Sequence, residues 1–336
     1  MTDKPDLTVA IDLGTTFTGV GFLFPNGTIY ILNNWPGSNS GNEVKVPNRL
    51  VYNHDNTISS WGFSCALQDD PLPLGKREHR HFRMFFDPET SSMARCMGLT
   101  ATCSNKQAEK CTTDFLREIH DHIERTYGEL NGADWSNETV AFLFSVPTTW
   151  RGLAAINTLR NAIRSSGFGT RGHHHTVQFD LTEAEAAVAD TFKSDSAQCE
   201  EGDIFLTIDV GESTTDLSLV QVTNFGDGIR EISQITEVSG IGTGSLLIDY
   251  AFGNLIEERL AGSPDVPFEI SNGLARKMMN SKQFQIVKDL FGDPAAIATV
   301  HRILIPGVSN TFNHDKLHIA RGAMIIDKYN FLQLSH

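Results

Sequence analysis

Alternating hydrophobic and polar positions predict two similar groups of β-strands in this chain. Residues 8–24, "TVAIDLGTTFTGVGFLF", form two β-type runs on either side of a Gly-Thr-Thr turn. Residues 205–220, "FLTIDVGESTTDLSLV", repeat the arrangement, and each copy is followed by a glycine-containing turn and a third β-type run. The first strands of the two copies reach Asp12 and Asp209, which lie 197 positions apart. The repeat therefore predicts two related lobes.

The segments between and after the two copies alternate between helix-type and strand-type patterns. Residues 112–127 place Phe115, Ile119 and Ile123 on one helical face after a threonine cap. The other predicted elements are a strand over 139–147, a helix over 151–167 whose inward residues include Leu153, a strand over 176–181, a helix over 183–192, helices over 246–260 and 273–292, and a strand within 316–327.

The repeat and the polar segments predict the domain organisation of an α/β protein. We expect a first lobe over 1–192, with an irregular inserted subdomain at about 34–111, and a second lobe over 204–336. The polar stretch 193–203, "KSDSAQCEEGD", is the predicted linker. Fewer positions follow the second copy than the first lobe uses, so we expect the second lobe to be incomplete.

Composition and charge exclude several classes of protein. The chain carries 27 Lys and Arg against 41 Asp and Glu, which argues against nucleic-acid and anionic-membrane partners. Its five cysteines form no C-x-x-C pair, so neither a zinc ribbon nor a disulfide framework is indicated. The first twelve residues have no apolar signal core, and no uncharged apolar run approaches ~18 residues. We therefore expect a cytoplasmic protein with no nucleic-acid or membrane partner.

The two Asp-Gly turns are candidate phosphate sites. A carboxylate followed by glycine and small hydroxyl residues brings bare backbone N–H groups to an anion and lets the acid hold the anion's metal. A single turn of this kind would be interpreted as an ordinary hairpin. Because the chain has two, each with its own following strands, a phosphate site is the better interpretation. The motifs of P-loop proteins, zincins and serine hydrolases do not occur.

The segments around these turns resemble a known family. "IDLGTTFTGVGF" and "IDVGESTTDLSLV" are similar to the two phosphate loops of the actin-like ATPases, and specifically of the heat shock protein 70 chaperones. "VPTTWRGLAAINTLRNAIRSSGF", "LTEAEAAVAD" and "SGIGTGSLLIDYAF" resemble the connecting strand and helix, the segment with the catalytic glutamate, and the glycine turn and helix after the second loop. The resemblance is greatest to a divergent fungal and animal branch. It implies duplicated, ribonuclease H-like lobes with a nucleotide cleft between them.

The resemblance also implies a role for each matching residue. Asp12 and Asp209 would hold Mg²⁺, mostly through water. Glu183 would orient the water that attacks the γ-phosphate, and Thr214 would donate hydrogen bonds to the β- and γ-phosphates. These two residues, with Asp12 and Asp209, are the implied catalytic residues. The residues implied to bind ATP or ADP are Gly14, Thr15, Thr16, Phe17, Gly211, Glu212, Ser213, Gly242 and Gly244.

Several departures from the family pattern weaken the implied activity. Glu212 stands where the family has glycine, and two like unit charges about 4 Å apart repel by roughly 4 kcal/mol at an effective dielectric near 20. Ala66 stands where a lysine near the γ-phosphate is expected, which removes electrostatic stabilisation of the transferring phosphoryl group. No segment resembles the family's adenosine loop or its peptide-binding domain.

Three functions stay open at this point. The first is a chaperone-type ATPase that closes its two lobes on Mg-ATP and works with a co-chaperone or another protein partner. The second is a catalytically inactive pseudo-ATPase, or a truncated fragment, that acts as a protein-interaction module; Glu212 and Ala66 favour it. The third is a small-molecule kinase of the same superfold, which only the analogy of fold supports.

Overall fold

The computed structural model contains two compact units. The first comprises residues 1–66 and 72–244, and the second comprises residues 67–71 and 245–336. The structure describes residues 4–38, 41–65, 72–97, 104–132, 135–147, 150, 153–171, 174–193, 200–226, 229–236, 239–241, 243–261, 274–275, 278–279 and 281–290.

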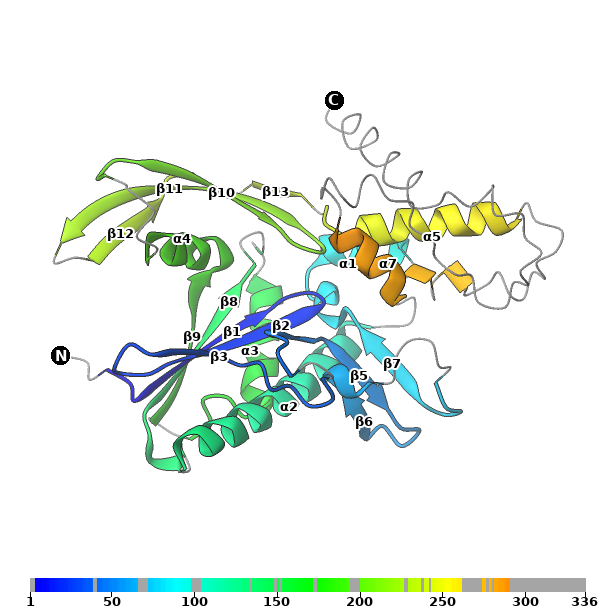
Figure 1. Cartoon of the computed structure of the whole chain (residues 1–336), viewed down its shortest axis with the longest axis horizontal. Coiled ribbons are helices and arrows are strands. Elements are labelled where there is room, and N and C mark those ends of the chain that lie inside the picture. Colours follow the sequence, from blue (N-terminus) through cyan, green and yellow to red (C-terminus); the bar gives the residue numbers. More distant parts are fainter. Residues whose placement is uncertain are drawn as a thin grey trace. The chain divides into compact units, whose positions relative to one another are not determined.

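A six-stranded sheet contains the first copy of the repeat. Its strands follow the order β3-β2-β1-β8-β9, and β4 also pairs with β2 (Figure 1). β1 is antiparallel to β2 and parallel to β8. The bounds are β1 Leu7–Leu13, β2 Phe17–Leu23, β3 Ile29–Ile31, β4 Lys45–Pro47, β8 Val140–Val146 and β9 His175–Thr182. These bounds confirm the strands predicted over 8–24, 139–147 and 176–181.

The alternation of β1 gives this sheet a buried face. Leu7, Val9, Ile11 and Leu13 are at most 1% exposed, as the period of two along a half-buried strand requires. Each such side chain contributes about 1.5–3 kcal/mol by leaving water.

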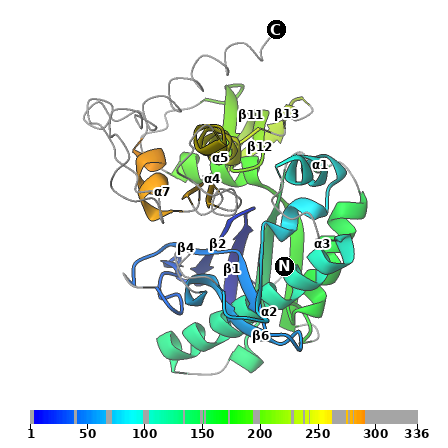
Figure 2. The same ribbon diagram turned by 90° about the vertical axis from the view of Figure 1, so that its right-hand side faces the viewer.

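Two helices complete the core of the first copy. α2 (Asn105–Asn131) packs against α3 (Leu153–Ser165), and both lie beside the sheet (Figures 1 and 2). The predicted inward residues of α2 are buried. The start predicted at residue 112 is wrong, because the hydroxyl of Ser104 accepts a bond from the Gln107 N–H and caps the helix earlier. The prediction for Leu153 is also wrong: Leu153 is exposed, and the buried face of α3 is made by Ala155, Leu159, Ala162 and Ile163.

Residues 34–111 form more regular structure than predicted. β5 (Arg49–Tyr52) lies between β6 (Ile58–Trp61) and β7 (Arg77–Arg80) in a separate antiparallel sheet. The short helices η1 (Gly62–Ser64) and η2 (Phe82–Phe85) and the helix α1 (Pro88–Cys96) follow in the same segment. β4 joins the main sheet instead, so the insertion is tied directly to the first copy.

The second copy forms a sheet of the same order. Its strands are β10 (Ile204–Val210), β11 (Thr215–Gly226) and β12 (Ile229–Gln234), and β13 (Ser239–Ile241) pairs with β11 as β4 pairs with β2. This correspondence confirms the predicted duplication. α4 (Glu183–Lys193) contacts β8 and β9 of the first sheet and β10 and β11 of the second (Figure 1).

One face of β10 differs from its counterpart in β1. Ile204, Leu206, Ile208 and Val210 are 56–68% exposed, although they occupy the positions of four buried residues in the first copy. The duplication therefore repeats the hydrophobic pattern but not its burial.

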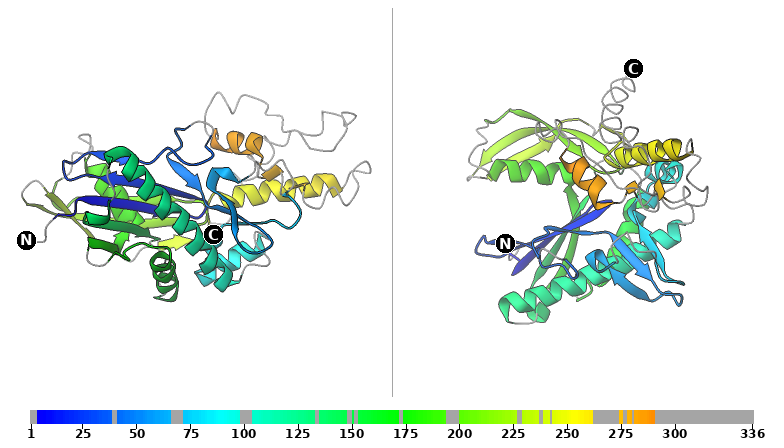
Figure 3. Two further views of the ribbon diagram at one scale, coloured as in Figure 1. Left: turned by 90° about the horizontal axis from the view of Figure 1, so that it is seen from below. Right: turned by 45° about the vertical axis from the view of Figure 1, so that its right-hand side comes forward.

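The second unit contains α5 (Leu246–Ala261) and α7 (Lys282–Asp289), which are yellow and orange in Figure 3. Phe252 and Ile256 of α5 pack with Phe284 of α7 in one hydrophobic cluster. α7 begins inside the helix predicted over 273–292, because the Ser281 hydroxyl accepts a bond from the Phe284 N–H and caps it. The strand predicted within 316–327 lies outside the described residues, and the linker at 193–203 stays a prediction.

Acidification should destabilise the fold through His122. Its ring is buried beside Trp35, and neither ring nitrogen has a hydrogen-bond partner among the described residues. Burial, with a smaller contribution from Arg125, lowers the pKa of His122 to about 4. Between the unfolded-state pKa of about 6.5 and this value, only the unfolded chain takes up the proton. The free energy of unfolding should therefore decrease as the pH is lowered from about 6.5 to about 4, by up to ~1.4 kcal/mol per pH unit.

Urea denaturation at pH 7, 6 and 5 measures this dependence. His122→Phe should show a shallower slope than the parent chain. His54→Phe, which changes an exposed histidine, is the matched control and should keep the parent slope. Equal slopes for the parent and His122→Phe would contradict the assignment.

Candidate functional site

The two Asp-Gly turns have the same geometry. In the first, the Gly14 N–H donates to the Phe17 carbonyl at 3.0 Å, and in the second the Gly211 N–H donates to the Thr214 carbonyl at 2.9 Å. Each turn joins two antiparallel strands, and Asp12 and Asp209 occupy the same register position before it. The sequence repeat is thus a repeat of local structure.

Both turns bring the backbone close to their first residue, and the first turn leaves no room for a side chain there. A Cβ on Gly14 would lie 2.6 Å from the Phe17 carbonyl oxygen, and one on Gly211 would lie 3.1 Å from that of Thr214. A contact of 2.6 Å is too short for any carbon atom. Glycine therefore permits the close approach on which each turn depends.

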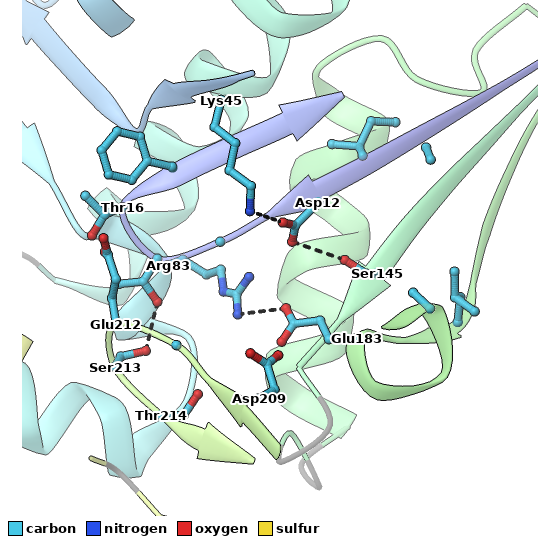
Figure 4. Close-up of a pocket in the computed structure, with 18 of the residues that line it drawn as sticks. Asp12, Thr16, Lys45, Arg83, Ser145, Glu183, Asp209, Glu212, Ser213 and Thr214 are labelled. Carbon is cyan, nitrogen blue, oxygen red and sulfur yellow. Dashed lines mark hydrogen bonds and ion pairs between the residues drawn. The ribbon is translucent and has the colours of Figure 1, made fainter. Parts of the chain in front are cut away.

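The turns meet across one pocket. The Thr15 and Ser213 hydroxyls lie 2.8 Å apart and share a hydrogen bond. The pocket has a volume of about 430 Å³, within the usual range of small-molecule sites. Figure 4 shows side chains from both turns around it. Of the predicted residues, the pocket is lined by Asp12, Gly14, Thr15, Thr16, Phe17, Glu183, Asp209, Gly211, Glu212, Ser213 and Thr214.

Asn48 fixes the first turn. Its side-chain amide donates to the Gly14 carbonyl at 2.8 Å, and its carbonyl oxygen accepts from the Thr18 hydroxyl at 2.6 Å. Its backbone N–H donates to the Thr16 carbonyl at 2.6 Å. Asn48 is 1% exposed, so these groups have no access to water to replace the bonds. The sequence pattern gave no indication of this role.

Gly244 fixes the second turn. A Cβ on Gly244 would lie 2.3 Å from the Glu212 carbonyl oxygen, so the chain after β13 lies directly against the turn. The Thr215 hydroxyl donates to the Thr243 carbonyl at 2.7 Å and holds the two segments together. Gly242, the other predicted glycine of this segment, lies outside the described residues.

Glu183 begins α4 at the edge of the pocket. The Thr182 hydroxyl accepts from the Glu185 N–H, and the Glu185 carboxylate accepts from the Thr182 N–H, which together form a capping box. The helix start points Glu183 toward the pocket (Figure 4). Burial raises the pKa of Glu183, Arg83 opposes the shift, and the nearby Asp12 and Asp209 add to it.

Arg83 is a site residue that the sequence pattern did not reveal. Its guanidinium lies 3.5 Å from the Glu183 carboxylate and 5.3 Å from the centre of the Trp150 ring. It is 7% exposed and lines the pocket (Figure 4). Ala66, where a lysine was expected, lies outside the described residues. Arg83 therefore provides a buried cation from a different place in the inserted segment.

Asp12 faces a second cation. The Lys45 ammonium lies 2.7 Å from Asp12 Oδ2, and the Ser145 hydroxyl donates to Oδ1 at 3.5 Å. The described residues contain no group of three or more His, Cys, Asp or Glu arranged to hold a metal ion. The residues present therefore do not form a ready magnesium site around Asp12.

Thr16 contacts the inserted segment through His81. Its hydroxyl lies 3.4 Å from His81 Nδ1. Burial, with a contribution from Arg80, lowers the pKa of His81 to about 4, so the ring is neutral at pH 7. The cations that face the pocket's four carboxylates are thus Lys45 and Arg83.

Comparison with known proteins supports the predicted resemblance. No protein-family model matches the sequence. Heat shock 70 kDa protein 12A of Mus musculus is 21% identical over 305 residues, which cover 74% of this chain and 45% of that protein. The Homo sapiens protein of the same name is 22% identical over 304 residues, with the same coverage. The chain thus spans about half the length of these relatives. The prediction of a divergent chain similar to the heat shock protein 70 family is confirmed.

Solved structures that are similar to parts of this chain include two of MreB5 from Spiroplasma citri. The one bound to ADP has a TM-score of 0.47 and 14% identity, covering 75% of this chain and 56% of its own. The one bound to AMPPNP has a TM-score of 0.48 and 12% identity, covering 98% and 78%. Among the described residues, no helix is long and apolar enough to cross a membrane.

Replacing Asn48 by alanine should destabilise the chain by about 2–3 kcal/mol. The change leaves the Gly14 carbonyl and the Thr18 hydroxyl buried without these partners, and each unsatisfied group costs about 1–3 kcal/mol. Urea denaturation measures the loss. Asn26→Ala, which removes a side-chain acceptor from an exposed turn, is the control and should cost less than about 1 kcal/mol. Equal losses of unfolding free energy in the two variants would contradict the role of Asn48 in holding the first turn.

Proposed function

We propose that this chain binds ATP or ADP, with the phosphates lying between the two Asp-Gly turns. The observation that carries the proposal is the contact of the turns across one pocket, where the Thr15 and Ser213 hydroxyls meet at 2.8 Å. Phosphate binding needs convergent N–H and hydroxyl donors that a side chain does not screen. The Thr15 and Ser213 hydroxyls, one from each turn, are donors of this kind that line the pocket.

The charges of the pocket favour an anion accompanied by cations. Asp12, Glu183, Asp209 and Glu212 line it and would repel bare phosphates. Arg83 is buried there, and a guanidinium can bind phosphate with two parallel hydrogen bonds. When phosphate enters, we expect the Arg83 guanidinium to move partly away from Glu183, which it contacts at 3.5 Å, and toward the phosphate. It would then supply the charge that Ala66 lacks.

Hydrolysis is the proposed chemical step. Water would attack the γ-phosphorus, the bond from that phosphorus to the bridging oxygen would break, and ADP and phosphate would leave. We assign the orientation of this water to Glu183, and Thr214 of the second turn lines the same pocket. Because burial raises the pKa of Glu183, its carboxylate is a more basic partner for that water. We expect turnover to be slow, since Glu212 opposes the charge of the phosphates.

The chaperone-type role and a protein partner are proposed from the relatives alone. A second candidate function is a pseudo-ATPase that binds nucleotide or protein without catalysis. The observation that favours it is Glu212, which takes the place in the second turn that Thr15 takes in the first. Magnesium, if it accompanies the nucleotide, would be expected on the Asp209 side of the pocket.

Nucleotide should raise the melting temperature of the purified chain by a few degrees. A ligand at 100 times its dissociation constant stabilises by ~2.7 kcal/mol, which gives a shift of this size for a protein of this length. Differential scanning fluorimetry with millimolar ATP or ADP, with and without Mg²⁺, measures it. Asp209→Asn is the control and should abolish the magnesium-dependent part. Absence of any shift in a cooperatively melting chain would refute nucleotide binding.

Replacing Glu212 by threonine should tighten ATP binding at least tenfold. The change copies Thr15 of the first turn and removes one negative charge from beside the phosphates. Isothermal titration calorimetry gives the affinities. Glu201→Thr removes an equal charge from an exposed position outside the pocket and should leave the affinity unchanged. Equal ATP affinities for the two variants would show that the position of the Glu212 carboxylate does not affect ATP binding.

A further inference from the structure

Lys45, Gly19 and Asp12 form one row across the first sheet. Gly19 of β2 pairs with Asp12 of β1 on one side and with Lys45 of β4 on the other. The row places a lysine and an aspartate on either side of a residue that has no side chain. The Lys45 ammonium reaches over this gap to within 2.7 Å of Asp12 Oδ2.

Gly19 lies beneath the Lys45 side chain. A Cβ on Gly19 would lie 3.4 Å from Lys45 Cγ and 3.5 Å from Lys45 Cε, so the methylene chain lies directly over the glycine. A Cβ at this position would thus be in ordinary van der Waals contact with the lysine stem. The strand pairing places Lys45 so that its stem runs across Gly19 toward Asp12.

The second copy lacks this cation. Asp209 of β10 pairs with Asp216 of β11, which pairs with Gly240 of β13. The equivalent row thus contains two carboxylates and a glycine, where the first copy has a carboxylate, a glycine and a lysine. The two halves of the pocket therefore differ in charge, although their backbones repeat.

We propose that Lys45 is a built-in cation that takes the place at Asp12 which the resemblance gives to magnesium. The proposal rests on the proposed nucleotide site. An ammonium is a compact, strongly hydrated charge on a flexible stem, so it can bridge Asp12 and a phosphate oxygen. A divalent ion beside Asp12 would meet this like charge at short range. Lys45 thereby restricts a divalent ion to the Asp209 side, and the first turn binds phosphate without one.

The exposure of the pair fits an exchangeable contact. The side chains of Lys45 and Asp12 are 51% and 44% exposed, and an ion pair of this kind contributes little to stability. Lys45 can thus move from Asp12 onto a phosphate at small cost. Because the fold gains little stability from the Lys45–Asp12 ion pair, we assign Lys45 to the binding of a negatively charged ligand.

Binding of Mn²⁺ without nucleotide is the first test, measured by electron paramagnetic resonance. Lys45→Met should bind Mn²⁺ at least tenfold more tightly than the parent chain, and Lys45→Met with Asp12→Asn should lose that gain. Lys45→Arg keeps the charge and should resemble the parent. Lys76→Met, which changes a lysine outside the pocket, is the control. Equal affinities for the parent and Lys45→Met, or binding by neither, would overturn the proposal.

Binding of ADP in EDTA and in Mg²⁺ is the second test, measured by calorimetry. The parent should still bind ADP in EDTA, whereas Lys45→Met should bind ADP at least tenfold more weakly than the parent in EDTA and should depend more strongly on Mg²⁺. An equal dependence on Mg²⁺ in both chains would overturn the role of Lys45. Failure of ADP and ATP to bind in either condition would instead refute the proposed function. The Mn²⁺ result would still decide whether Lys45 keeps a divalent ion away from Asp12.

Discussion

Close backbone approach at two glycines is the constraint on which this structure depends. Gly14 and Gly211 each let a strand reverse within a few residues; at Gly14 no side chain fits without a shift of the backbone, and at Gly211 a side chain would make a tight contact. The reversals bring Asp12 and Asp209 to the edge of one pocket and leave the hydroxyls of the turns facing each other. The same local geometry joins β1 to β2 in one sheet and β10 to β11 in the other. The chemistry of the site is thus set first by backbone sterics and only afterwards by charge.

The sequence predicted the repeated part of the site and missed the unrepeated part. Hydrophobic alternation and the Asp-Gly turns are local signals, so the strands around Asp12 and Asp209 could be placed with their residues. Lys45, Asn48 and Arg83 carry no local pattern, because Lys45 and Arg83 reach the pocket, and Asn48 reaches the first turn, only through the folding of the inserted segment. The prediction that Leu153 faces inward is wrong, because an apolar residue at the end of a helix can point outward while the rest of the helix keeps its buried face. Long-range placement, rather than local conformation, was beyond the sequence pattern.

The insertion is what makes the two halves of the pocket different. It provides the lysine beside Asp12, the arginine beside Glu183 and the amide that holds the first turn. The second half has its glycine contact at Gly244 and additional carboxylates in place of cations. A duplicated scaffold has thus kept its symmetric backbone and become asymmetric in charge. An anionic ligand lying between the turns would therefore meet an attractive half and a repulsive half.

The exposed apolar face of β10 bears on how the chain reaches its fold during synthesis. The first sheet and the helices α2 and α3 that complete its core all precede residue 193, so this half can fold as soon as it leaves the ribosome. The strands of the second sheet emerge later with Ile204, Leu206, Ile208 and Val210 still facing water. An exposed row of apolar side chains of this kind favours association between chains. Because these side chains stay exposed in the folded structure, that tendency persists after synthesis.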